Sequence, residues 1–111
     1  MYWAKYHIAH LRRWREAAKT VARAVEALGL KARVYVIGGA AEGRLTVLSD
    51  VDILVCLEEE LDPRRVKHMV LEEAFNRQGL PDDYPLQLHV HTARECKNLL
   101  TRYKSIPVDK L

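Results

Sequence analysis

Long apolar runs are absent from this chain, and no stretch approaches the roughly 18 residues that a helix needs to cross a bilayer. The N-terminal residues also lack the apolar segment of a secretory signal peptide. Cysteine is scarce, with only Cys56 and Cys96. We expect both to remain thiols, with Cys56 as a small buried hydrophobe, because a reducing compartment disfavours disulfides. These absences argue against a membrane protein and predict a cytoplasmic one.

Asn and Gln are also rare, with two of each, while Arg and Glu are plentiful. This balance is typical of proteins from thermophiles. The chain contains no internal repeat and no low-complexity segment. Its 111 residues, 49% apolar and 30% charged, predict a single domain over residues 1–111 with one modest core.

The net charge of +3 is unevenly distributed. Residues 1–33 contain eight Lys or Arg and two Glu, whereas the rest of the chain has ten basic and thirteen acidic residues. A basic first helix could attract a nucleic acid or an acidic partner. A solvated helix face explains the same pattern, and we favour that interpretation, so we do not expect nucleic acid as a partner.

The spacing of apolar residues predicts helices and strands in alternation. The first helix ends at Gly29, and Thr92 with Glu95 forms a capping box for the last one. Asp62 and Pro63 are typical of a helix start. We predict a helix over 5–28, a strand over 33–37, a helical turn over 40–43, a strand over 50–57, a helix from 63 to about 79, a strand over 86–91 and a helix from 93 to about 103.

This order predicts an α/β (α+β) fold in which helices flank a small mixed sheet. In the helix after Pro63 we expect an inward face made of Val66, Met69, Val70 and Phe75. Residues 105–111 are predicted to be a loose tail or a docking segment. Trp3, Tyr6 and Trp14 could stack on a base, but we favour a place at one end of the core.

The segment from Gly38 to Val55 contains the residues that say most about function. A glycine pair, Gly38 and Gly39, follows one apolar run, and Ser49-Asp50-Val51-Asp52 opens the next. Carboxylates at i and i+2 of a strand face the same side, where a hard cation can neutralise them. The glycine turn leaves backbone N–H groups for a phosphate. A phosphate cradle beside a Mg²⁺ or Mn²⁺ site predicts nucleotide chemistry.

This segment resembles the signature of the nucleotidyltransferases of the DNA polymerase β superfamily, and most of all the stand-alone minimal nucleotidyltransferases of archaea and bacteria. The likeness covers the motif and, more loosely, the core at residues 34–91. It implies a polymerase β-like catalytic domain. The second glycine of the motif, Gly39, stands where the family often has Ser, so a hydroxyl contact is lost while the backbone donors remain.

By the resemblance, Asp50 and Asp52 hold the metal ions, and Gly38 and Gly39 approach the nucleotide phosphates. Ser49 orients the loop or touches a phosphate. Arg44 is a phosphate partner or a surface arginine, with neither reading favoured.

The family's third carboxylate has no counterpart here. On the third strand, Gln87 stands at the matching position and His89 is the next candidate; Gln cannot act as a base, whereas neutral His can accept a proton. His89 and His91 could also bind zinc, but nothing completes a four-ligand set. We expect His7 and His10 to be surface residues.

The resemblance implies transfer of a nucleoside monophosphate, AMP from ATP above all, to a hydroxyl with Mg²⁺. The chain has no room for an acceptor domain, so the acceptor is small, a second copy as in a homodimer, or a partner such as a helical HEPN-type protein. The alternative is a nucleotide- and metal-binding module that acts through a partner, antitoxin-like, because Gln87 replaces the carboxylate. A third option is a nucleic-acid-binding accessory that uses the basic first helix.

Overall fold

The computed structural model describes residues 2–111, and side chains from residue 5 onward. Trp3, expected at one end of the core, lies outside the described side chains. In chain order the elements are α1 (Tyr2–Arg12), α2 (Trp14–Ala27), β1 (Ala32–Ile37), α3 (Gly38–Glu42), β2 (Val51–Leu57), α4 (Pro63–Asn76), β3 (Leu86–Thr92), α5 (Ala93–Arg102), β4 (Ile106–Pro107) and the 3-10 helix η1 (Val108–Lys110).

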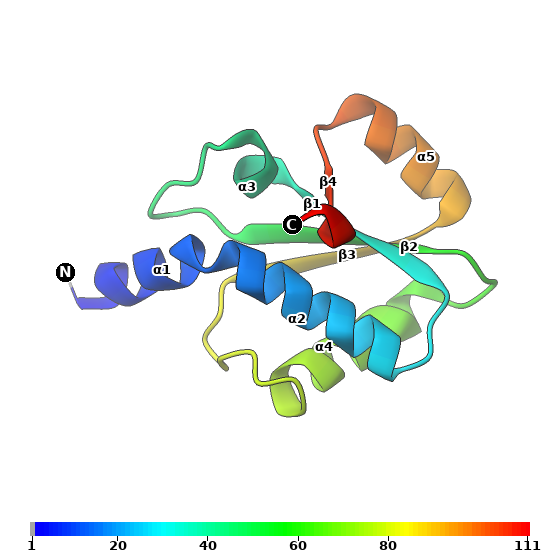
Figure 1. Cartoon of the computed structure of the whole chain (residues 1–111), viewed down its shortest axis with the longest axis horizontal. Helices are drawn as coiled ribbons and strands as arrows, with labels where there is room; N and C mark the ends of the chain where they lie inside the picture. Colours follow the sequence, from blue (N-terminus) through cyan, green and yellow to red (C-terminus); the bar gives the residue numbers. More distant parts are fainter. Residues whose placement is uncertain (1) are drawn as a thin grey trace.

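The four strands form one mixed sheet in the order β3-β2-β1-β4 (Figure 1). Strand β2 runs parallel to β3 and antiparallel to β1, and β4 pairs antiparallel with the outer side of β1. Residues directly opposite one another share a face of the sheet. One face therefore carries Asp52, Leu54 and Cys56 of β2 beside Gln87, His89 and His91 of β3. The predicted fold class is confirmed.

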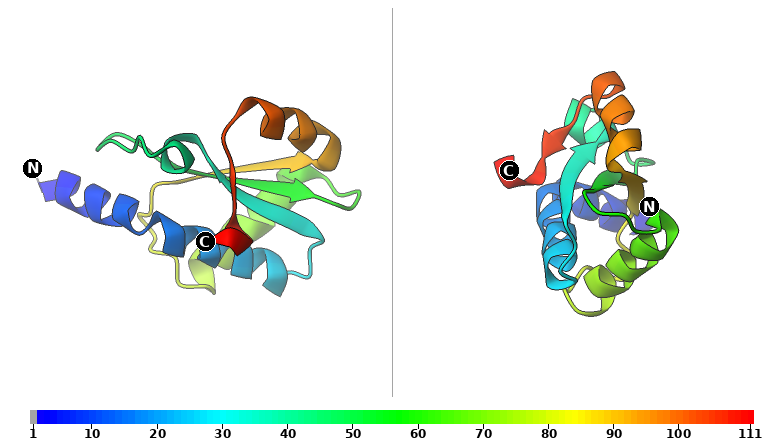
Figure 2. Two further views of the ribbon diagram at one scale, coloured as in Figure 1. Left: turned by 45° about the horizontal axis from the view of Figure 1, so that its top comes forward. Right: turned by 90° about the vertical axis from the view of Figure 1, so that its right-hand side faces the viewer.

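Helices cover both faces of this sheet (Figures 1 and 2). Helices α2 and α4 lie on one face, and α3 and α5 lie on the other. The larger core fills the space under α2 and α4, and a smaller cluster of Leu54, Cys56 and Cys96 lies against α5. Asp52 is the only residue of β2 that is not buried. A carboxylate in an otherwise buried strand does not favour stability, because burial of an ionised carboxylate is costly. Its presence there points to a function.

The predicted first helix is divided in two at Arg13, so the expectation of one continuous helix is wrong. In a continuous helix the His10 carbonyl would accept from the N–H of residue 14. Here it accepts from the Arg13 N–H at 3.1 Å and from the Tyr84 hydroxyl at 2.8 Å. A side chain that binds into the helical ladder is a recognised cause of a kink. Trp14 is buried just after the break, as expected for a core aromatic.

Two helix starts confirm the local signals. The Asp62 side chain accepts from the Arg64 N–H, with Pro63 at the first helical position. Thr92 and Glu95 form the reciprocal capping box of α5.

The predicted inward position of Met69 on α4 is wrong, because its side chain is 39% exposed. Val66, Val70 and Ala74 already fill the inner face of α4.

Residues 105–111, expected to be a loose tail or a docking segment, form part of the folded domain. Ile106 and Pro107 pair with Val36 and Tyr35 and make the fourth strand, which sequence reasoning did not place. The following residue, Val108, is buried in the larger core. A strand of two residues is too short to show an alternating pattern, which is why the sequence does not reveal it. The buried Val108 anchors the chain directly after the strand.

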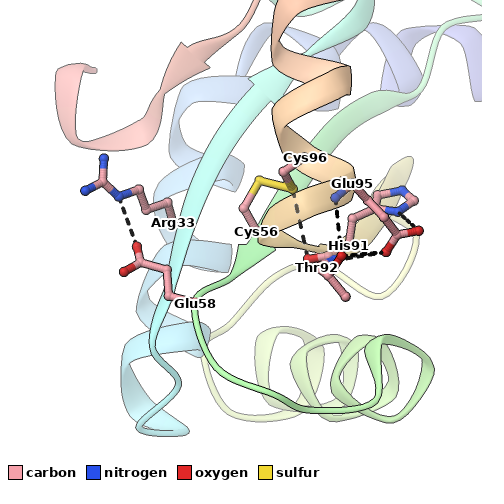
Figure 3. Close-up of a disulfide and its surroundings, with 7 residues drawn as sticks. All are labelled: Arg33, Cys56, Glu58, His91, Thr92, Glu95 and Cys96. Atoms are coloured by element: carbon pink, nitrogen blue, oxygen red, sulfur yellow. Dashed lines mark hydrogen bonds and ion pairs between the residues drawn. A yellow bond between two sulfur atoms is a disulfide. The ribbon is translucent and has the colours of Figure 1, made fainter.

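The cysteines are joined, contrary to the expectation of two thiols. Cys56 on β2 and Cys96 on α5 form a disulfide with a Cα–Cα distance of 5.9 Å (Figure 3). That distance lies within the range that a disulfide needs. Both residues are buried in the same cluster under α5. The sequence places them 40 residues apart, and only the packing of α5 on the sheet brings them together.

Among the described residues, no helix is both long and apolar enough to span a membrane.

Candidate active site

The glycine pair forms a sharp turn from strand to helix. Strand β1 ends at Ile37, which is extended, and α3 begins at Gly38 with φ +68°. A positive φ of this kind is readily adopted only by glycine. The first N–H groups of a helix have no acceptor within it. The turn at the end of β1 therefore contains backbone N–H groups that have no acceptor within α3.

Gly38 lies directly against Asp52. A Cβ atom at position 38 would stand 2.5 Å from Asp52 Oδ2, a distance that real Cβ atoms do not show. The register explains the approach, because Ile37 of β1 pairs with Asp52 of β2. The glycine turn and the second carboxylate of the motif are thus one structural unit.

Two side chains of β3 complete this group. Gln87 pairs with Asp52 in the register, and its exposed side chain shares the face of that carboxylate. His89 lies one position further along that face, and its Nε2–H donates to Asp52 Oδ1 at 3.0 Å. An ionised carboxylate only accepts hydrogen bonds, so Nε2 of His89 carries the proton. Nδ1 of a neutral His89 then holds the free lone pair.

The first carboxylate, Asp50, lies just outside the strand. The prediction that β2 begins at residue 50 is off by one, because the register with β3 starts at Val51. Asp50 is exposed, at the same end of β2 as Asp52. The two motif carboxylates therefore flank the first strand residue, with Asp52 in the sheet and Asp50 on the loop that enters it.

Ser49 holds this loop together. Its N–H donates to the Thr46 carbonyl at 2.9 Å, and its Oγ accepts from the Thr46 N–H at 2.8 Å. Its carbonyl accepts from Nε2–H of His7 at 2.8 Å. Of the two predicted roles of Ser49, loop orientation is the one that these contacts favour. Arg44 pairs instead with Glu42, and both side chains are partly or largely exposed.

His7 was expected to be a surface residue and is part-buried against the motif loop. Its partner lies 42 positions away, so no local spacing could reveal the contact. The expectation of a surface position is also wrong for His10, because its ring bonds Asp83 at 3.0 Å and its side chain is only 17% exposed.

Comparisons with known proteins show the family and the fold of this chain. The sequence model of a family described as nucleotidyltransferase domain matches residues 18–106. This chain belongs to that family. A crystal structure of a candidate nucleotidyltransferase from Sulfolobus solfataricus has a similar fold, with a TM-score of 0.60 and 20% identity over 91% of this chain and 84% of the other. No curated protein matches the chain in sequence.

Nucleotidyltransferases usually employ a divalent metal, and the donor set can be tested for one. Within the described part of the chain, no three His, Cys, Asp or Glu residues are grouped closely enough to hold a metal ion. A closed zinc site of four protein ligands is therefore not supported around His89 and His91. Mg²⁺ needs fewer protein ligands, because one or two carboxylates suffice when substrate phosphates supply the rest. Asp52 on β2 and Asp50 just before this strand are the two carboxylates that the motif offers for it.

Proposed function

We propose that this nucleotidyltransferase transfers a nucleoside monophosphate, AMP from ATP above all, to a hydroxyl acceptor and releases pyrophosphate. The proposal rests on one juxtaposition in a chain of this family: Gly38 and His89 both contact Asp52, and Gln87 lies opposite it. Bound Mg²⁺ or Mn²⁺ would stabilise the charge that develops on the phosphates. Asp50 and Asp52 would hold it, and the N–H groups at Gly38 and Gly39 would meet the phosphates.

The transfer exchanges one P–O bond for another. The acceptor oxygen bonds to the α-phosphorus while the bond from that phosphorus to the β-phosphate oxygen breaks. The hydroxyl proton needs an acceptor, and the neutral amide of Gln87 cannot provide it. Nδ1 of His89 is suited to this step, because Nε2–H is directed to Asp52 and fixes the tautomer.

The acceptor that we propose is a hydroxyl on a partner protein, with a HEPN-type helical protein as the first partner to try. The support is two exposed apolar side chains, one on each of the segments that carry His7 and Ser49. Ile8 of α1 is 38% exposed, and Leu48 of the motif loop is 79% exposed. A second copy of the chain could occupy the same surface. Both would place an acceptor next to Asp50.

A second candidate function is a binding module that holds nucleotide and metal without turnover. The position of Gln87 favours it, because a neutral side chain occupies the place opposite Asp52 where the family usually has a carboxylate. Binding itself needs mainly the glycine turn and the two aspartates.

Labelling with ATP that carries a radioactive α-phosphate distinguishes the two. Wild type, Asp50→Asn/Asp52→Asn and the control Asp109→Asn, an exposed residue on η1, are incubated with Mg²⁺, alone and with extract from the source. Label on a macromolecule in wild type and control, but not in the double variant, establishes transfer and identifies the acceptor. Mg-ATP binding that the double variant loses, without label transfer, supports the binding module.

A further inference from the structure

Helix α1 lies outside the part of the chain that matches the family. The match begins at residue 18, whereas α1 covers Tyr2–Arg12. Even so, His7 of this helix donates its Nε2–H to the Ser49 carbonyl at 2.8 Å. The contact is part-buried and reaches the residue immediately before Asp50. An element outside the matched residues therefore touches the backbone of the motif.

The Ser49 carbonyl belongs to the peptide unit that joins Ser49 to Asp50. This unit is planar, so fixing its oxygen also fixes the direction in which the chain enters Asp50. Among the contacts of the described residues, the other polar groups of Ser49 bond to Thr46, within the same loop. Among these hydrogen bonds, the one from His7 connects the loop before β2 to another element, helix α1.

The direction of α1 is itself set by long-range contacts. Tyr84 donates its hydroxyl to the His10 carbonyl at the kink, and the His10 ring bonds Asp83 at 3.0 Å. Figure 1 shows α1 leaving the body at this kink and running below the loop that joins α3 to β2. The helix is therefore held at its C-terminal end, and His7 is carried to the loop.

We propose that His7 is a positioning residue for Asp50, which makes α1 a working part of the active site. His7 holds the Ser49 carbonyl and so sets the direction of the Asp50 carboxylate. The effect on metal binding rests on the proposed function. The effect on the loop does not, and it can be measured separately.

Three variants test the hydrogen bond between His7 and Ser49. His7→Leu removes the donor, and His7→Gln keeps an N–H donor on a side chain of similar reach. His68→Leu is the matched control, since His68 is an exposed histidine on another helix, α4. Thermal unfolding followed by circular dichroism first confirms that each variant folds.

Amide hydrogen exchange of peptides covering residues 43–51 is the first measurement. We expect exchange about fivefold faster in His7→Leu, the ratio that corresponds to losing one hydrogen bond. We expect wild-type exchange in His7→Gln and His68→Leu. Unchanged exchange in His7→Leu overturns the proposal, whatever the protein does with metal.

Mn²⁺ binding by titration calorimetry is the second measurement, with Asp50→Asn/Asp52→Asn as reference. His7→Leu should weaken binding about fivefold, and His7→Gln should restore it. Equal affinity in wild type and His7→Leu, despite faster exchange, overturns the positioning of Asp50. If wild type binds no Mn²⁺, the metal site of the proposed function fails and the positioning of a metal-binding Asp50 is overturned with it, while the exchange result still decides whether His7 holds the loop.

Discussion

Gly38 and Asp52 are so close that any side chain at position 38 would displace the carboxylate. A Cβ atom there would lie 2.5 Å from Oδ2, and the φ of +68° is itself unfavourable for other residues. We predict that Gly38→Ala moves Asp52 and weakens Mn²⁺ binding about tenfold or more, the loss typical of disturbing a metal ligand through its neighbour. Titration calorimetry measures it.

The matched control for this variant is Gly29→Ala. Gly29 has the same φ of +68°, but nothing lies within 4 Å of a Cβ there. The control should lose about 1–2 kcal/mol of stability from backbone strain and keep its Mn²⁺ affinity. If both variants bind Mn²⁺ equally, Asp52 is not a ligand of the ion.

Gln87→Glu should tighten Mn²⁺ binding about tenfold, since a third carboxylate adds charge to the ligand set. The new carboxylate would lie opposite Asp52 in the register. Asn98→Asp on the exposed side of α5 adds the same charge elsewhere and should have little effect. Transfer activity that appears only in Gln87→Glu supports the binding module for the natural chain. Equal activity in both proteins supports the enzyme.

The parts of this fold that sequence could predict depend on local chemistry. Asp62 caps α4 and Thr92 caps α5, because each interaction lies within a few residues of the chain. The glycine turn and the motif aspartates were likewise located, since a positive φ and a strand start leave local signals. The structure brings Gly38, Gln87 and His89 together around Asp52, whereas β2 begins one residue later than predicted, at Val51.

The parts that sequence could not predict depend on distant partners. At the kink before Arg13, the His10 carbonyl accepts from Tyr84, which is 74 positions away. His7 bonds to Ser49 across 42 positions, and the disulfide joins two cysteines 40 positions apart that meet because α5 packs against β2. Apolar spacing along one helix contains no information about which distant donor will reach its backbone.

The disulfide should contribute much of the stability of this small domain. It closes a loop of about 40 residues, for which the chain-entropy estimate is about 3–4 kcal/mol. We predict that urea unfolding under reducing conditions shows a loss of this size. Cys56→Ala/Cys96→Ala should be insensitive to the reductant. Rapid alkylation of both cysteines in untreated, unfolded protein would show that the bond does not form.

The capping box of α5 should make the free energy of unfolding depend on pH in the acidic range. Hydrogen bonds from the Thr92 backbone N–H and hydroxyl, at 3.1 and 3.0 Å, lower the pKa of Glu95 below its ordinary value of 4.5, and His91 adds a smaller electrostatic effect. A pKa that folding lowers means that the ionised group stabilises the folded state above pH 4.5. This contribution is lost as the pH falls through the lowered pKa.

We therefore predict that Glu95→Gln unfolds more easily than wild type between pH 5 and 7, and that the difference shrinks as the pH falls below about 4.5. Urea unfolding across this range measures the difference. Glu72→Gln on the exposed side of α4 is the matched control and should follow wild type throughout. A constant difference down to low pH would mean that the glutamine amide, which cannot ionise, disturbs the cap by shape alone. Charge on Glu95 would then contribute nothing to the start of α5.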